Sequence, residues 1–165
     1  MLHKASVAGM TMDPASNSPI IFLKTEDDGE VIPIWIGLLE ATSIASVLQS
    51  IKFDRPMTHD LFKNVLERVQ VDLLKVEICD IHDNTFFARL HFASDASRFE
   101  MDARPSDAIA IALRLSAPIY IDDKVIEKSK IQGPEGELTD KSLEGKKWAE
   151  YLESLSPDAF GKYKI

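Results

Sequence analysis

The sequence predicts an α+β fold with a strongly curved, mainly antiparallel sheet of about seven strands, three packed helices and a C-terminal helix. Short apolar runs recur along the chain and are joined by tight turns, which is typical of antiparallel strands. Asp28-Gly29 and Asp83-Asn84 lie between such runs as two-residue hairpin turns. Between the strands, apolar residues recur at the three- and four-residue spacing of helices.

The first third of the chain predicts three strands and a helix. Residues 3–12, 19–25 and 31–36 have the composition of strands, with Asp28-Gly29 as the turn between the last two. The predicted helix covers residues 38–51, because its apolar positions follow helical spacing: Leu38, Ala41, Ile44, Ala45, Leu48 and Ile51. Glu40 falls in the first turn of this helix.

The middle of the chain predicts a second helix and three more strands. Thr58 is expected to cap a helix that reaches Val69. The apolar face expected for this helix consists of Leu61, Phe62, Val65, Leu66 and Val69. The strands are expected at residues 73–81, 86–93 and 98–103, with Asp83-Asn84 turning the chain between the first two.

The segment Asp102 to Arg114 is expected to be the centre of the fold. Arg104 precedes a proline, which favours extended backbone, and Pro105 suits the first position of a helix. Asp107 then falls in the first turn, at the positive end of the helix dipole. Every residue from 108 to 113 is apolar, so the helix has little solvent-facing surface. We therefore expect Asp102, Arg104 and Asp107 to cluster where a strand runs into a buried helix.

The last part of the chain is divided by a linker. Residues 119–121 are expected to form a short buried strand, and Val125-Ile126 either a strand or a turn of helix. The linker at 132–137 contains two glycines and a proline, and an amphipathic helix is predicted from 141 to 155. We accordingly divide the chain into a domain at 1–130 and an extension at 131–165.

Composition limits the class of protein. The chain has 165 residues, 45% of them hydrophobic, and a net charge of −8. No apolar run is long enough to cross a membrane, no secretory core is visible, and a single cysteine excludes an internal disulfide. We expect a cytoplasmic protein that does not bind membranes. The acidic charge argues against a broad surface for the phosphate backbone of nucleic acid.

Two short segments of the sequence are similar. Residues 40–45 parallel residues 107–112, and each segment opens a helix after a hydrophobic strand with a carboxylate in the first turn. Duplication of a strand–helix unit would place Glu40 and Asp107 in equivalent positions. A chance match of six residues remains the alternative.

Six residues could carry chemistry: Glu40, His59, Asp60, Asp102, Arg104 and Asp107. Carboxylates at helix starts can hold Mg²⁺ or Mn²⁺, and we expect Asp102, Asp107 and Glu40 to be the ligands. Arg104 could contact a phosphate through two N–H groups, and His59 could act as a general acid or base. The alternative is structural: Arg104 would neutralise neighbouring carboxylates in a buried ion-pair network.

Other kinds of site have less support. Four histidines and one cysteine show no zinc-ligand spacing, and no glycine-rich phosphate loop is present. Ser106 lacks the glycine-flanked turn of a nucleophilic serine. Trp35 and Tyr120 could stack on bases, but their isoleucine neighbours favour positions in the core or its wall.

The segment Asp102-Ala103-Arg104-Pro105-Ser106-Asp107-Ala108-Ile109-Ala110 resembles the signature of the bifunctional nuclease domain family. Further matching segments follow in family order: 34–37 with Glu40-Ala41, 55–61, and 117–120. The end of the chain, 155–160, resembles an extension of many bacterial members. The resemblance implies a nuclease acting on DNA or RNA. The alternative function is a non-catalytic interaction or regulatory module, and for either function we expect a homodimer or larger homo-oligomer.

Overall fold

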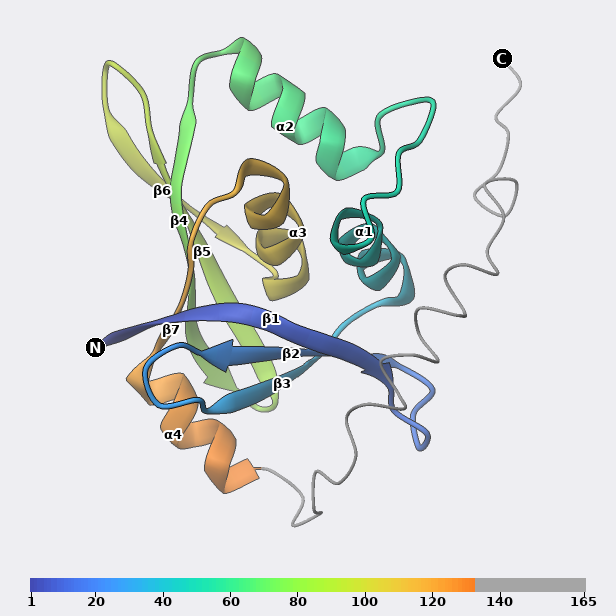
Figure 1. Cartoon of the computed structure of the whole chain (residues 1–165). Helices are drawn as coiled ribbons and strands as arrows, with labels where there is room; N and C mark the ends of the chain where they lie inside the picture. The colour runs from blue at the N-terminus through green and yellow to red at the C-terminus, as the bar shows by residue number, and fades with distance from the viewer. Residues whose placement is uncertain (133–165) are drawn as a thin grey trace.

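The computed structural model describes residues 1–132, and the side chains of residues 1–129. It contains one open seven-stranded sheet in the order β3-β2-β1-β7-β4-β5-β6 (Figure 1). The strands are β1 (Leu2–Met12), β2 (Pro19–Thr25), β3 (Val31–Trp35), β4 (Asp72–His82), β5 (Thr85–Ala93), β6 (Arg98–Ala103) and β7 (Ile119–Asp122). The helices are α1 (Leu38–Leu48), α2 (Thr58–Arg68), α3 (Pro105–Leu115) and α4 (Asp123–Gln132).

The predicted α+β class is confirmed. Every neighbouring pair of strands is antiparallel except β4 and β7, which run parallel. Strands β1, β2 and β3 cross the direction of β4, β5 and β6, so the sheet is strongly curved (Figure 1). The two predicted turns are also present, because Gly29 has a φ of 73° and Asp83 and Asn84 have φ of 47° and 60°.

The chain repeats one arrangement. β1, β2 and β3 form an antiparallel meander that leads into α1, and β4, β5 and β6 form a second meander that leads into α3. Glu40 is the third residue of α1, and Asp107 is the third residue of α3. The two carboxylates therefore occupy equivalent positions, as the short sequence match predicts.

Helix α3 packs against α1 and α2 and on β4 and β5. Seven of its eleven residues are buried, which confirms the prediction of a central helix: Pro105, Ser106 and Ala108 to Ala112. Alanine alternates with isoleucine along this stretch, and the small side chains let neighbouring backbones come close. Helix α4 packs on β4 and β7, away from the other three helices (Figure 1).

Helix α2 differs from its prediction in two ways. Thr58 is its first helical residue, and Met57 takes the capping position because the Asp60 Oδ2 atom accepts the Met57 N–H at 3.0 Å. Only part of its apolar face is covered: Leu66 is buried, whereas Leu61, Val65 and Val69 are about half exposed. An exposed stripe of three apolar side chains, one turn apart, therefore runs along α2.

Two smaller expectations are also decided. The first helix ends at Leu48 rather than residue 51, and Val125-Ile126 lies in helix α4 rather than in a strand. The predicted helix at 141–155 and nearly all of the linker lie outside the described residues. No helix in the described part of the chain is long and apolar enough to cross a membrane.

Candidate active site

The start of α3 is held to α1 and α2 by a continuous series of polar contacts. Arg104 donates from Nε to the Asp107 Oδ2 atom at 2.7 Å, and its Nη2 lies 2.9 Å from the Glu40 Oε1 atom. The second oxygen of Asp107, Oδ1, accepts from His59 Nε2 at 2.9 Å. His59 Nδ1 is in turn 2.8 Å from the Ser43 hydroxyl. These five residues, Ser43, His59, Asp107, Arg104 and Glu40, are the polar chain.

The position of Arg104 follows from its local sequence. Arg104 is the N-cap of α3 with extended backbone (φ −68°, ψ 145°), as expected for a residue before proline. Its side chain is 67% exposed, so it is not the centre of a buried ion-pair network. The recorded bonds to Asp107 and Glu40 use two of the five guanidinium N–H groups. The remaining donors can contact a ligand at the surface.

The charges in the polar chain stabilise one another. The hydrogen bond and charge of Asp107 raise the pKa of Arg104 above its usual value. Burial acts to raise the pKa of Asp107, but hydrogen bonds and charge from Arg104 and His59 outweigh it and hold that pKa below its usual range. Asp107 is therefore an anion at neutral pH.

The ionised Asp107 also fixes the proton on His59. A carboxylate can only accept, so His59 Nε2 must carry the hydrogen in that bond. In the neutral ring Nδ1 is then unprotonated and accepts the Ser43 O–H. The order hydroxyl, imidazole, carboxylate is the one used for general acid–base chemistry. The His59 side chain is 14% exposed, so the ring is held firmly while it remains in contact with solvent.

Gly37 allows Glu40 to reach Arg104. Gly37 is the N-cap of α1, and the Glu40 carboxylate folds back over it. A Cβ atom at position 37 would overlap the Glu40 Oε2 atom. The absence of a side chain at Gly37 is therefore what permits the contact between Glu40 and Arg104.

Asp60 is beside this site but belongs to a second contact. Its Oδ1 atom accepts from Arg114 Nε at 2.6 Å, and the Arg114 Nη1 group donates to the backbone oxygens of Ser43 and Ala110. The Arg114 side chain is only 4% exposed. Burial acts to raise the pKa of Asp60. Arg114 and the Met57 N–H lower it by more, so the net pKa is below its usual value.

The sequence-based reasoning did not identify Ser43 or Arg114. A signal for each was present in the helical spacing: Arg114 lies two turns after Asp107, and Ser43 lies one turn after Glu40. In α3, Arg114 is also the only charged residue after Asp107.

Asp102 makes no hydrogen bond or ion pair with the polar chain among the described residues. On β6, Phe99 stacks on the buried Phe92, and Ala103 packs against the core. Side chains alternate along a strand, so the exposed Asp102 points to the other face of the sheet, where its cross-strand neighbour is Arg89. The expected cluster at the junction thus contains Arg104 and Asp107, with Glu40 in place of Asp102.

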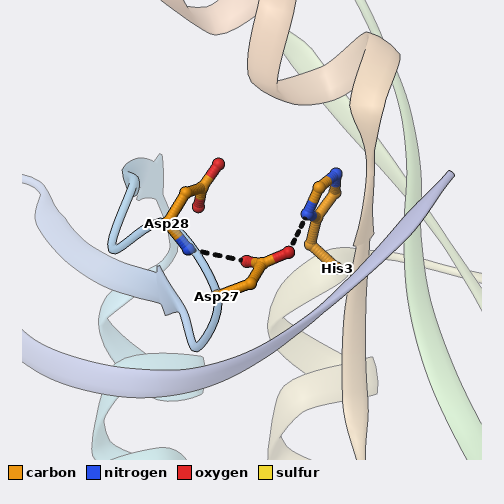
Figure 2. Close-up of side chains that lie close together, drawn as sticks. All are labelled: His3, Asp27 and Asp28. Atoms are coloured by element: carbon orange, nitrogen blue, oxygen red, sulfur yellow. Dashed lines mark hydrogen bonds and ion pairs between the residues drawn. The ribbon is translucent and has the colours of Figure 1, made fainter.

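Within residues 1–132, one group of three acidic or histidine side chains is close enough to share a metal ion: His3, Asp27 and Asp28. Figure 2 shows the His3 ring directed at Asp27, and the ring also contacts Asp123. Hydrogen bonds from the His3 ring to the carboxylates of Asp123 and then Asp27 raise the pKa of His3. This group joins β1 to the β2–β3 turn, and it contains none of the residues predicted as metal ligands.

A surface pocket of about 350 Å³ adjoins the polar chain. Both repeated units line it: residues 34–37 come from the end of β3 and the start of α1, and residues 84–86 and 104–106 come from the second unit. Ser18 completes the lining. The pocket thus lies between the N-cap of α1, Gly37, and the start of α3 at Arg104 to Ser106.

Comparison with known proteins agrees with the resemblance seen in the sequence. A family model described as the bifunctional nuclease domain matches residues 21–133. An uncharacterized protein of Mycobacterium tuberculosis is 35% identical over 96% of this chain and 98% of its own length.

Two plant proteins are also similar. Bifunctional nuclease 1 of Arabidopsis thaliana is 27% identical over 81% of this chain, and Bifunctional nuclease 1 of Oryza sativa subsp. japonica is 28% identical over 64%. The alignments span 44% and 33% of those plant proteins, so much of each plant chain has no counterpart here. Because the family model matches more than half of its residues, this chain belongs to the bifunctional nuclease domain family.

Proposed function

We propose that the protein is a nuclease that hydrolyses phosphodiester bonds of DNA or RNA at the polar chain. The observation that carries the proposal is the continuous contact from Ser43 through His59 and Asp107 to the exposed guanidinium of Arg104. It combines a positioned proton-transfer group with a cation free to bind phosphate. Membership of the family supports the same reaction.

Each residue has a defined part in the proposed reaction. Arg104 binds the non-bridging oxygens of the scissile phosphate through its remaining N–H groups and offsets the charge that develops there. His59 takes or gives a proton at Nδ1, with the Ser43 hydroxyl as the group beside it. Asp107 holds the ring orientation and stabilises the imidazolium. Glu40 and Asp107 together hold Arg104 in place.

Metal assistance is a separate part of the proposal. Glu40 and Asp107 supply the two carboxylates with which Mg²⁺ or Mn²⁺ is commonly held, the other ligands being water and substrate phosphate. Such an ion would activate water and neutralise charge on the phosphate. Arg104 already pairs with both carboxylates, so an ion held by them would compete with its guanidinium. Asp102 points elsewhere, so three protein carboxylates do not converge here. We therefore propose that only Glu40 and Asp107 would serve as protein ligands.

The test is a cleavage assay with matched variants. Single- and double-stranded DNA and RNA are incubated with purified protein in Mg²⁺, Mn²⁺ or chelator. His59→Ala should lower the rate by about 100-fold or more if the ring transfers the proton. The control is His82→Ala, because the His82 side chain is 63% exposed and lies on β4, outside the polar chain.

The same assay decides the alternatives. Equal cleavage by wild type, His59→Ala and Asp107→Asn would identify a contaminating enzyme and contradict the proposal. Loss of activity in chelator would support the metal, and full activity there would remove it from the proposal. The second candidate, a non-catalytic interaction module, is favoured by the net charge of −8 and would show no cleavage under any condition.

We further propose that the protein forms a homodimer or larger homo-oligomer. The exposed stripe Leu61, Val65 and Val69 on α2 supports association, because contiguous exposed apolar side chains often mark interfaces. Light scattering at micromolar concentration tests the assembly, and a monomer would refute it.

A further inference from the structure

We propose that the pocket beside Arg104 binds one nucleotide of a single-stranded nucleic acid, with its base against Trp35 and its phosphate at Arg104 and Ser106. This inference names the substrate class of the site proposed above, and in that respect it rests on the proposed function. It draws on three features that the polar chain does not include: the cavity, an exposed tryptophan and a buried hydroxyl.

The cavity has the size and lining of a nucleotide site. Its volume of about 350 Å³ is within the range of small-ligand pockets. One part of its lining is apolar and aromatic, formed by Ile34, Trp35, Ile36 and Phe86. The other part is polar, formed by Arg104, Ser106, Asn84 and Ser18. A nucleotide has the same division, with an aromatic base at one end and an anionic phosphate at the other.

Trp35 is held in an orientation that leaves its ring accessible. It is the last residue of β3, an edge strand, and is 47% exposed. Its indole N–H donates to the Asp13 Oδ2 atom at 3.1 Å, and Asp13 is itself fixed by Ser16 and the Ala15 N–H. A large aromatic ring with restricted motion is a suitable surface for a base, because every base has a π-face.

The polar part of the pocket lining offers hydrogen-bond donors to a phosphate, and within the described part of the chain these donors have no protein acceptor. Ser106 is 5% exposed, lines the pocket, and its hydroxyl has no hydrogen bond among those recorded there. Buried hydroxyls normally have a partner, so this one indicates a ligand or water. α3 has no side-chain cap, and its first turn presents backbone N–H groups next to the spare donors of Arg104. These groups together match the oxygens of one phosphate.

The surroundings favour a single strand over a duplex. A base can lie on Trp35 only when it is unstacked, which a single strand permits at little cost. Duplex binding relies on many phosphate contacts, whereas Arg104 is the one cation in the pocket lining and the chain carries a net charge of −8. The pocket is therefore expected to bind a short segment with shallow salt dependence.

Fluorescence of Trp35 provides a direct test. The chain has two tryptophans, so Trp148→Phe leaves Trp35 as the sole reporter in an otherwise full-length protein. Short oligothymidylate and oligouridylate are titrated in chelator, which suppresses metal-dependent cleavage, and binding is followed in parallel by anisotropy of a labelled strand. We expect quenching at the same concentrations as binding, and weaker binding of a duplex of equal length.

Variants identify the two ends of the pocket. Trp35→Ala should weaken binding by about 5- to 150-fold, and Trp35→Phe should restore part of it because a phenyl ring still stacks. Arg104→Ala should reduce the slope of log K against log salt by about 0.7, the value for one phosphate contact to a single strand. Phe87→Ala is the matched control, since Phe87 is 37% exposed and is not among the pocket-lining residues.

The outcomes separate this inference from the proposed nuclease. Quenched, Trp35-dependent binding without cleavage would support the pocket and refute the nuclease. Cleavage with binding unchanged in Trp35→Ala would support the nuclease and overturn the pocket. Thymidine monophosphate binding as tightly as the oligonucleotide would overturn the assignment to a strand, and equal binding of duplex would overturn the preference for single strands.

Discussion

The two ends of helix α3 each carry an arginine paired with a carboxylate, and they differ mainly in exposure. At the first end Arg104 contacts Asp107 and Glu40 with 67% of its side chain exposed. At the last turn Arg114 contacts Asp60 and two backbone oxygens with 4% exposed. The same pairing therefore has different consequences, because solvent screens the first and not the second.

This difference separates a group available for binding from a group required for folding. The recorded Arg114 bonds connect α3 to α1 and α2 at once, since it reaches the Ser43 oxygen and the Asp60 carboxylate. Arg104 leaves several donors free and borders a pocket. We conclude that the open end of α3 is suited to a ligand, whereas the buried end fixes the three helices that position the polar chain.

The largest predicted effect concerns Arg114. Arg114→Met keeps the length of the side chain but removes its charge, so Asp60 loses its cation and the Ser43 and Ala110 carbonyls each lose one of their donors. We expect the free energy of unfolding to fall by roughly 3 kcal/mol, the lower part of the range for a broken buried pair, because Asp60 is 33% exposed. Urea denaturation measures this loss.

A double-mutant cycle with Asp60→Asn sharpens the same result. Asparagine can still accept the Met57 N–H, so the variant removes the charge while retaining the cap. Arg114→Met should cost less unfolding free energy in the Asp60→Asn background. That difference would be the coupling free energy between Arg114 and Asp60. Equal costs in the two backgrounds would contradict a coupling between Arg114 and Asp60.

The next effect is at Gly37. Gly37→Ala should displace the Glu40 carboxylate and release Arg104 on one side, since a Cβ atom there overlaps that carboxylate. Stability should change by less than about 1 kcal/mol, because the Arg104 side chain in the lost contact is 67% exposed and solvent screens the pair. Cleavage and strand binding should fall to the level of Glu40→Gln. The control is Gly9→Ala, as nothing lies within 4 Å of a Cβ atom at that position.

The smallest effect is a dependence of stability on acidic pH. Asp60 and Asp107 have pKa values below the usual 3.8, so each contributes stability above that pH and loses it as pH falls through its folded value. The unfolding free energy should therefore decline below about pH 4, and Asp60→Asn should flatten part of the decline. An unchanged slope in Asp60→Asn would show that its carboxylate is not stabilised by Arg114.

Much of the fold could be predicted because local signals agreed with the tertiary structure. The turns at Asp28-Gly29 and Asp83-Asn84, the apolar run of α3 and the proline after Arg104 each specify local geometry. The exposed side of α2 could not be predicted, because it depends on which neighbours pack against that helix. The Met57 cap rests instead on a local contact, since Asp60 accepts the N–H of the residue three positions before it.

The candidate site was predictable only in part. Four of the predicted site residues do contact one another, because each lies at or near the start of a helix and those helices pack together: Glu40, His59, Arg104 and Asp107. Asp102 does not join them, because strand alternation turns it to the other face. Ser43 and Arg114 lie inside helices without a motif of their own, so only the packing of α1, α2 and α3 reveals them.

The most direct test of the central claim is one comparison of wild type with Arg104→Ala by urea denaturation and by binding to a single strand. We expect an unfolding free energy within about 1 kcal/mol of wild type and a clear loss of binding and cleavage. Arg104→Lys should restore little of either, because it lacks the planar pair of donors. A loss of several kcal/mol in stability with unchanged binding in the folded protein would contradict the claim and make Arg104 a structural residue like Arg114.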